Sequence, residues 1–178
     1  SDVYKRQKKS SYVESDIANP LNIYGLSKAK ADEQVMHYNP QALIVRTSAF
    51  FGPWDKYNFI YQVLDSLKNG KNYCVANDVY ISPTYVPDLV SASLNILIDN
   101  EIGIWHLANK GELTWYELAL EVTQRANLSP QLLKPLSVEE LGFKAKRPFF
   151  SALSSTKGEP LPPLEQALDH FFESYKFN

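Results

Sequence analysis

The spacing of apolar and polar positions predicts helices and strands that alternate along the chain. The apolar, β-rich run at 42–45 predicts a buried parallel strand. Apolar residues three and four positions apart predict helices at 88–99 and 161–175. Thr114 and Ser137 each begin a Thr/Ser-x-x-Glu capping box, which predicts that one helix opens at each. The other predicted elements are short β-rich segments at 72–76 and 80–86, a strand at 104–109, and a helix ending at Gly70.

A further helix is predicted from Asn19 to about Tyr38. Asn19 can cap it, Pro20 fits its first turn, and Pro40 stops it. The helix leads directly into the strand at 42–45, and this order of elements is typical of an α/β protein.

Tyr24 and Lys28 lie four positions apart in this helix, so they share a helix face at about 5–6 Å. A cation beside a phenol favours the ionised phenol, which suits such a pair to proton donation. The spacing alone is explained equally well by two solvated helix residues. Tyr4 and Lys8 repeat the spacing, but without a capping signal or apolar periodicity.

Composition narrows the class of protein. With 178 residues, 44% of them hydrophobic, the chain suits one domain or the larger part of one. The net charge of −2 gives no electrostatic reason to expect nucleic acid or an anionic membrane as a partner. Cys74 is the only cysteine, which excludes an internal disulfide and a cysteine-rich metal site, and we expect it to be core. No apolar run suggests a membrane span or signal peptide, so the expected compartment is the cytoplasm, and no metal site is expected.

The segment 12–35, YVESDIANPLNIYGLSKAKADEQV, resembles the extended short-chain dehydrogenase/reductase superfamily. Within it the closest resemblance is to the dTDP-4-dehydrorhamnose reductase branch, the RmlD-like substrate-binding family. Its members carry Tyr-x-Glu-x-Asp, then Pro, then Tyr-Gly-x-Ser-Lys. Further family motifs recur at 46–52, 82–89, 104–117 and 145–153, so the resemblance spans essentially the whole chain.

The resemblance implies a reductase that uses NADP or NAD. Tyr24 would protonate the sugar carbonyl while a nicotinamide delivers hydride, and Lys28 would bind the nicotinamide ribose. Ser1 is the candidate counterpart of a hydroxyl that hydrogen-bonds the reacting carbonyl. Thr47 and Ser48 follow the strand at 42–45, and ligands of open α/β sheets bind beyond the carboxyl ends of strands.

Several residues expected to bind substrate also have a purely structural interpretation. Ala49 stands where the family commonly has a tryptophan against the sugar, and Trp54 is a candidate pocket wall. Asn58 and Phe59 either line the sugar-nucleotide pocket or serve as a helix cap and a core residue. Arg147 offers a planar fork suited to phosphate, or else forms a surface or interdomain salt bridge.

The glycines indicate what the chain lacks. No two of the seven glycines are closer than eight positions, so no Gly-rich phosphate-binding turn can form. We therefore expect residues 1–178 to be a single RmlD-like fragment without the dinucleotide-binding half, which would be lost, fused or separate, and expect the fragment to be inactive alone. The expected fold is the C-terminal portion of a Rossmann-like, doubly wound parallel sheet with a small mixed α/β substrate-binding lobe.

The expected function is reduction of the 4-keto group of a nucleotide-activated sugar. Two alternatives stay open: a non-catalytic regulatory subunit on the same fold, and a related nucleotide-sugar epimerase or dehydratase. A homodimer is a further candidate assembly. His106 is expected to be a structural histidine whose hydrogen bonds are satisfied, because no cysteine or carboxylate cluster flanks it.

Overall fold

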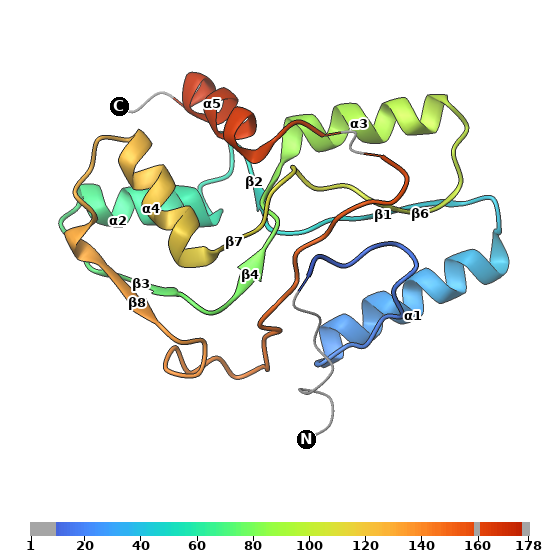
Figure 1. The fold of residues 1–178 in the computed structure, drawn as a ribbon, viewed down its shortest axis with the longest axis horizontal. Coiled ribbons are helices and arrows are strands. Elements are labelled where there is room, and N and C mark those ends of the chain that lie inside the picture. The colour runs from blue at the N-terminus through green and yellow to red at the C-terminus, as the bar shows by residue number, and fades with distance from the viewer. Residues whose placement is uncertain (1–9, 159–160, 176–178) are drawn as a thin grey trace.

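The computed structural model describes residues 10–158 and 161–175, and Figure 1 shows their arrangement. The helices are α1 (Ile23–Tyr38), α2 (Phe59–Lys68), α3 (Val86–Ile98), α4 (Trp115–Arg125), α5 (Leu164–Ser174) and the 3-10 turn η2 (Pro130–Leu132). The strands are β1 (Leu43–Arg46), β2 (Phe50–Phe51), β3 (Tyr73–Ala76), β4 (Tyr80–Ile81), β5 (Thr84–Tyr85), β6 (Gly103–His106), β7 (Leu113–Thr114) and β8 (Leu133–Leu136). No helix in these ranges is long and apolar enough to span a bilayer.

The strands pair mainly in parallel, which confirms the predicted α/β class. β1 pairs with β6, with Leu43 opposite Gly103 and Arg46 opposite His106. β2 pairs with β5 and β3 with β8 in the same parallel sense, whereas β4 and β7 are antiparallel. The carboxyl ends of β1 and β6 therefore lie at one edge, where ligands bind in open α/β sheets.

The described residues form two apolar cores. The larger core joins α2, α4 and α5 to the short strands, with Ile60, Val63 and Phe171 almost fully buried. The smaller core packs Ala92 and Ile96 of α3 against β6. In Figure 1, α3 lies on one side of the β1–β6 pair and α1 on the other.

The helix starts follow local hydrogen bonding. α1 begins three residues later than predicted, because Asn22 and not Asn19 is its cap: the Asn22 side chain accepts from the Gly25 amide. A β-carbon on Gly25 would lie 3.2 Å from the Pro20 β-carbon, so this close approach favours glycine. The capping box at Thr114 forms as predicted and opens α4.

Two predictions about individual segments were wrong, those for Ser137 and Cys74. The capping-box contacts of Ser137 with Glu140 form, but the residues that follow make a turn and not a helix. Cys74 is exposed and not core, although its neighbour Val75 is buried. The apolar stripe of α3 that includes Leu94 and Leu97 is exposed, since the helix packs through Ala92 and Ile96 on another face.

α1 is the least packed helix among the described residues. None of its side chains is buried, although it carries several large apolar residues. An ion pair at 2.8 Å between Arg46 Nε and Asp32 Oδ2 ties it to the end of β1. The side-chain amide of Asn22 also donates to the Lys146 carbonyl at 2.9 Å. Polar contacts, and not apolar burial, therefore position α1.

Glu14 connects three distant segments through hydrogen bonds to its carboxylate. It accepts from the Ser155 hydroxyl, from the Thr156 amide at 2.9 Å and hydroxyl at 3.1 Å, and from the His106 amide at 3.0 Å. Burial raises the pKa of Glu14, but these donors outweigh it and lower the pKa to about 2. The ionised carboxylate thus fixes the segment before α1 against β6.

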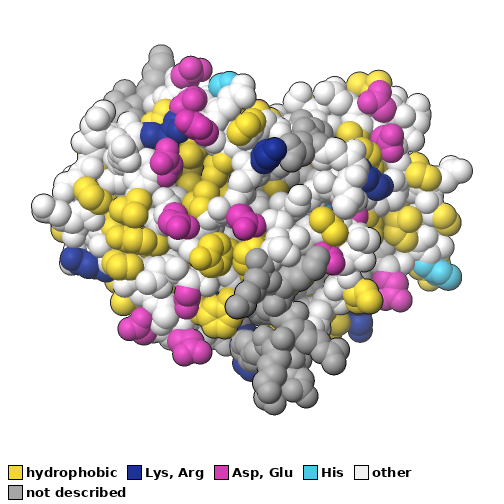
Figure 2. Space-filling model, in the orientation of Figure 1, with side chains coloured by type: hydrophobic (Ala, Val, Ile, Leu, Met, Phe, Trp, Pro, Cys, Tyr) yellow, Lys and Arg dark blue, Asp and Glu magenta, His cyan; other side chains and the backbone are white. Residues whose placement is uncertain are grey.

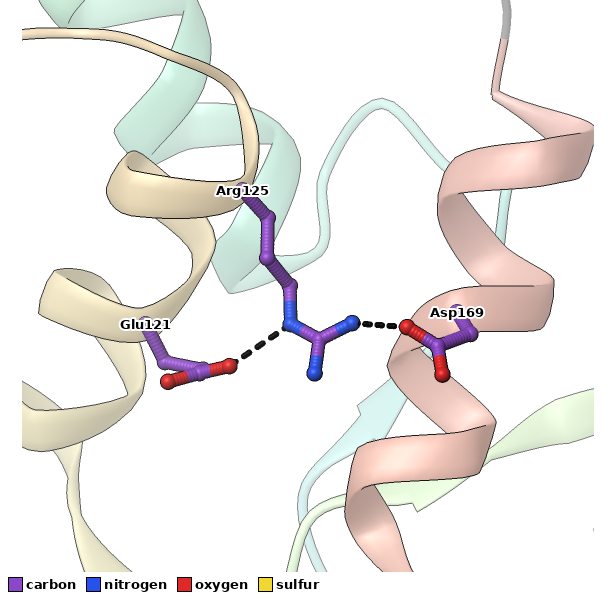
Figure 3. A network of polar contacts seen from close by, with 3 residues as sticks. All are labelled: Glu121, Arg125 and Asp169. Atoms are coloured by element: carbon purple, nitrogen blue, oxygen red, sulfur yellow. Dashed lines mark hydrogen bonds and ion pairs between the residues drawn. The ribbon is translucent and has the colours of Figure 1, made fainter.

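Arg125 joins α4 to α5. Its Nε donates to Glu121 Oε1 at 2.6 Å, and its Nη1 pairs with Asp169, as Figure 3 shows. The Glu121 contact is an i,i+4 pair with the acid towards the helix N-terminus, the favourable order.

Replacing Glu14 with Gln should destabilise the protein by about 1–3 kcal/mol at pH 7, because hydrogen bonds to a charged acceptor are lost. The pKa of this group is lower in the folded state, about 2 against an ordinary 4.5. Its contribution is therefore complete above pH 4.5 and is lost as the pH falls towards 2. Urea unfolding at pH 7, 4 and 2.5 should show that the difference in free energy of unfolding between Glu14→Gln and wild type decreases as the pH falls. Glu33→Gln, on the exposed face of α1, is the control; equal effects of the two changes would contradict this account.

Arg125→Met should lower the free energy of unfolding by about 1 kcal/mol, the upper range for partly exposed ion pairs. The loss should decrease in 1 M salt because exposed charges are screened. Thermal unfolding of Arg125→Met and Asp169→Asn, singly and combined, measures the coupling. An effect that does not change with salt would assign the role of Arg125 to packing and not to charge.

Candidate functional site

The Tyr24–Lys28 pair lies at the N-terminal end of α1, as its spacing predicts. The Lys28 Nζ is 5.6 Å from the centre of the Tyr24 ring, in a cation–π contact. The Tyr24 side chain is 72% exposed, so no described residue encloses the phenol. The geometry places a proton donor and a cation together at an open surface.

The carboxyl end of β1 lies on the same side of the molecule as this pair. Figure 1 shows α1 and β1 running in opposite directions, and the Arg46–Asp32 ion pair holds them together. Thr47 and Ser48, which follow β1, are half-buried. The Thr47 hydroxyl donates to the Thr84 hydroxyl at 3.3 Å, which joins this end to β5. The structure thus brings the predicted cofactor-binding residues to one side of the chain.

Ala49 has a backbone that is uncommon for a residue with a side chain. Its φ is 39°, in the left-handed region, and it connects the end of β1 to β2. The Thr84 amide donates to its carbonyl at 3.0 Å, which holds the turn in place. Backbone strain of this kind is found at ligand sites. Trp54 lies beyond β2 and is 77% exposed, so it forms no enclosed wall with the described residues.

Asn58 and Phe59 have clear structural roles. Asn58 is 6% exposed and caps α2, accepting from the Tyr61 amide at 3.0 Å and donating to the carbonyls of Gly52 and Asp55. Phe59 packs against Trp115, with ring centres 4.6 Å apart. Their side chains therefore serve the fold, and contact with substrate stays a prediction.

Arg147 is exposed, and its guanidinium stacks on Phe143 at 5.2 Å from the ring centre. The neighbouring Lys146 carbonyl accepts from Asn22, the cap of α1, so this loop lies at the Tyr24 end of the helix. Ser1, the predicted carbonyl-binding residue, lies outside the described residues.

The side chains at this edge suit one end of a dinucleotide. A phenol, an ammonium group and two hydroxyls can hydrogen-bond a nicotinamide ribose and a carbonyl group. The pyrophosphate needs closely spaced glycines, which the sequence does not have. The described residues therefore fit the nicotinamide end of such a cofactor, and other protein would have to hold the phosphates.

Sequence reasoning missed two residues at this edge. Glu14 matches a family motif, but its contacts come from residues more than 90 positions away, which no local pattern reveals. His106, predicted to be satisfied, uses Nδ1 against two carbonyls, while its Nε2 has no partner among the described residues. The expectation for His106 was therefore only half right.

Known proteins provide an independent comparison. The Bacillus subtilis spore coat polysaccharide biosynthesis protein SpsK is 34% identical over 80% of the chain, which covers 50% of that protein. The dTDP-4-dehydrorhamnose reductase of Aggregatibacter actinomycetemcomitans is 31% identical over 87% of the chain and 56% of that protein. The β subunit of methionine adenosyltransferase 2 from Danio rerio is 28% identical over 84% of the chain and 49% of that protein. The chain spans about half the length of these relatives.

Solved structures agree with the fold. The dTDP-4-dehydrorhamnose reductase from Bacillus anthracis, in complex with NADP, matches with a TM-score of 0.88 and 30% identity. That match covers 96% of this chain and 62% of the other. A dTDP-glucose 4,6-dehydratase from the same organism, in complex with NAD, matches at 0.79 with 18% identity, which supports the Rossmann-like fold alone. The RmlD substrate binding domain profile matches residues 2–176, and the chain therefore belongs to the RmlD substrate binding domain family.

Proposed function

We propose that this chain is the substrate-binding part of an NAD(P)H-dependent reductase that acts on the 4-keto group of a nucleotide-activated sugar. The observation that carries the proposal is the Tyr24–Lys28 pair, located on the same side as the carboxyl end of β1. Family membership and the NADP complex of the Bacillus anthracis relative support the reaction class.

In this proposal Tyr24 acts as the general acid. Its phenol donates a proton to the sugar carbonyl oxygen, and the Lys28 ammonium stabilises the phenolate that remains. Lys28 also hydrogen-bonds the nicotinamide ribose, while Thr47 and Ser48 border the cofactor. NADPH or NADH, when bound, would supply the hydride. Ala49 and Trp54 flank the sugar, and Arg147 approaches the substrate diphosphate with its planar fork.

The proposal requires a dinucleotide-binding half, either in the same polypeptide, fused or separate. Three surfaces suit such a partner. β1 has one described neighbour strand, β6, which leaves its other edge open to a further strand. α1 buries none of its side chains. α3 exposes an apolar stripe formed by Val90, Leu94, Leu97 and Ile98.

Two of these surfaces expose large apolar side chains that the second half would cover: Ile23 and Leu26 of α1, and Leu94 and Leu97 of α3. Figure 2 shows apolar side chains scattered among charged ones on the visible face. Parallel sheets bury both faces, because helices cover each side. Packing of the second half against α1 would also enclose the Tyr24 phenol, which is 72% exposed in the chain alone.

One alternative is a regulatory subunit that binds ligand without turnover. The similarity to the β subunit of methionine adenosyltransferase 2 favours this alternative, as does Ala49 in place of the usual tryptophan. A nucleotide-sugar epimerase or dehydratase is a third candidate, favoured only by the shared fold. Incubating the full-length protein with NADPH and a panel of 4-keto sugar nucleotides separates the reductase from the regulatory subunit. Consumption of NADPH supports the reductase, and binding without consumption supports the regulatory subunit.

Tyr24→Phe in the full-length protein should lower turnover by about 10²–10⁴-fold, because the general acid is removed. Binding of NADPH, measured by fluorescence titration, should be unchanged. Tyr38→Phe is the matched control, since Tyr38 is an exposed tyrosine of the same helix, and it should keep full activity. Turnover retained by Tyr24→Phe would refute the proposed role.

The 178-residue chain alone should oxidise no NADPH in the presence of dTDP-4-keto sugars, because its glycines cannot form a phosphate-binding turn. Absorbance at the NADPH band, with a complete dTDP-4-dehydrorhamnose reductase as positive control, measures this. Measurable oxidation by the chain alone would show that the phosphates are held in another way.

A further inference from the structure

Asp32 belongs to the same face of α1 as Tyr24 and Lys28. The three side chains follow one another at intervals of four residues, and residues at that spacing are neighbours on a helix surface. Lys28 therefore has the Tyr24 ring one turn before it and the Asp32 carboxylate one turn after it. Its ammonium group can act on the phenol only if the carboxylate does not attract it away.

The structure places Lys28 beside the phenol and not beside the carboxylate. The Lys28 Nζ is 5.6 Å from the centre of the Tyr24 ring. Among the described residues, no ion pair joins Lys28 to Asp32. Asp32 Oδ2 instead accepts from Arg46 Nε at 2.8 Å. The carboxylate one turn from Lys28 is thus already paired with another cation.

Arg46 holds this carboxylate from a fixed position. It is the last residue of β1, and its backbone carbonyl accepts from the Leu107 amide at 2.8 Å. The side chains of Arg46 and Asp32 are only 26% and 22% exposed. Solvent therefore screens this ion pair less than it screens a pair of fully exposed charges.

We propose that Arg46 is a positioning residue: by pairing with Asp32, it leaves the Lys28 ammonium group beside Tyr24. Without Arg46, the Asp32 carboxylate would attract Lys28 away from the phenol, because opposite charges four residues apart on a helix pair with each other. Lys followed by Asp is the less favourable order for such a pair, so the effect is moderate. This inference rests on the proposed function for its effect on turnover, but not for the placement of Lys28.

Arg46 and Asp32 also tie α1 to β1, so loss of this anchor is the competing explanation for any effect of their substitution. The two explanations differ for Asp32→Asn. This change breaks the ion pair, but it also removes the charge that would attract Lys28. The proposal expects Lys28 to stay beside Tyr24, whereas loss of the anchor would disturb the two residues as much as Arg46→Met does.

NMR of the 178-residue chain measures the placement of Lys28 directly. The nuclear Overhauser effect between the Tyr24 ring protons and the Lys28 side-chain methylene protons should be present in wild type and in Asp32→Asn. It should be weakened roughly 2-fold or more in Arg46→Met and restored in Arg46→Met/Asp32→Asn. Arg46→Met/Glu33→Gln is the matched control, because it removes an exposed acid of the same helix, and its signal should stay weak. No signal in wild type, an undiminished signal in Arg46→Met, or an equal loss in Asp32→Asn would overturn the proposal.

Kinetics of the full-length protein measure the consequence for turnover. With NADPH and a 4-keto sugar nucleotide, kcat should fall about 3- to 10-fold in Arg46→Met, and should recover to within about 2-fold of wild type in Arg46→Met/Asp32→Asn. Absence of this recovery would assign Arg46 to anchoring alone and overturn the proposal.

Two further variants complete the test. Tyr24→Phe tests the proposed function separately: if it turns over as fast as wild type, the reductase mechanism fails, and the NMR signal still decides where Lys28 lies. If Arg46→Met does not fold, Asp32→Asn decides. A wild-type signal and kcat in this variant support the proposal, and a loss of either one refutes it.

Discussion

The parallel pairing of β1 with β6 is the constraint on which the rest of the structure depends. Its register places Arg46 opposite His106, so the residues that follow both strands lie at the same end of the sheet. Arg46 then holds α1 through Asp32, and the His106 amide holds the segment before α1 through Glu14. One strand pair thus positions both α1 and the segment that precedes it.

The two apolar cores differ in how fully helices cover the strands. α2, α4 and α5 enclose a continuous core with the short strands. Around β1 and β6, α3 buries apolar side chains, while α1 is held by polar contacts. Apolar residues on the outer faces of α1 and α3 are what a larger α/β protein would cover. The proposed site therefore lies at a boundary that a second half of the sheet would close.

Local patterns predicted the elements well, because each depends on neighbours in sequence. Three features depend on sequence neighbours in this way: the strand β1, the Thr114 capping box and the Tyr24–Lys28 contact. Ser137 shows the limit: its cap contacts form, yet Gly142 at φ +64° follows five positions later and no helix propagates.

Features that depend on distant contacts could not be predicted. α3 has apolar residues on two faces, and only the position of β6 decides that Ala92 and Ile96 are the buried ones. Cys74 has apolar neighbours in sequence, yet it is exposed at its place in β3. The half-satisfied state of His106 depends on carbonyls from two remote segments.

The most direct test of the account is a crystal structure of the full-length protein with NADP and a sugar nucleotide. The account predicts that the Tyr24 hydroxyl lies within about 3 Å of the reacting oxygen of the sugar. It also predicts that the Lys28 ammonium group contacts the nicotinamide ribose. A Tyr24 hydroxyl that remains in solvent, or is covered by protein with no nicotinamide nearby, would contradict it.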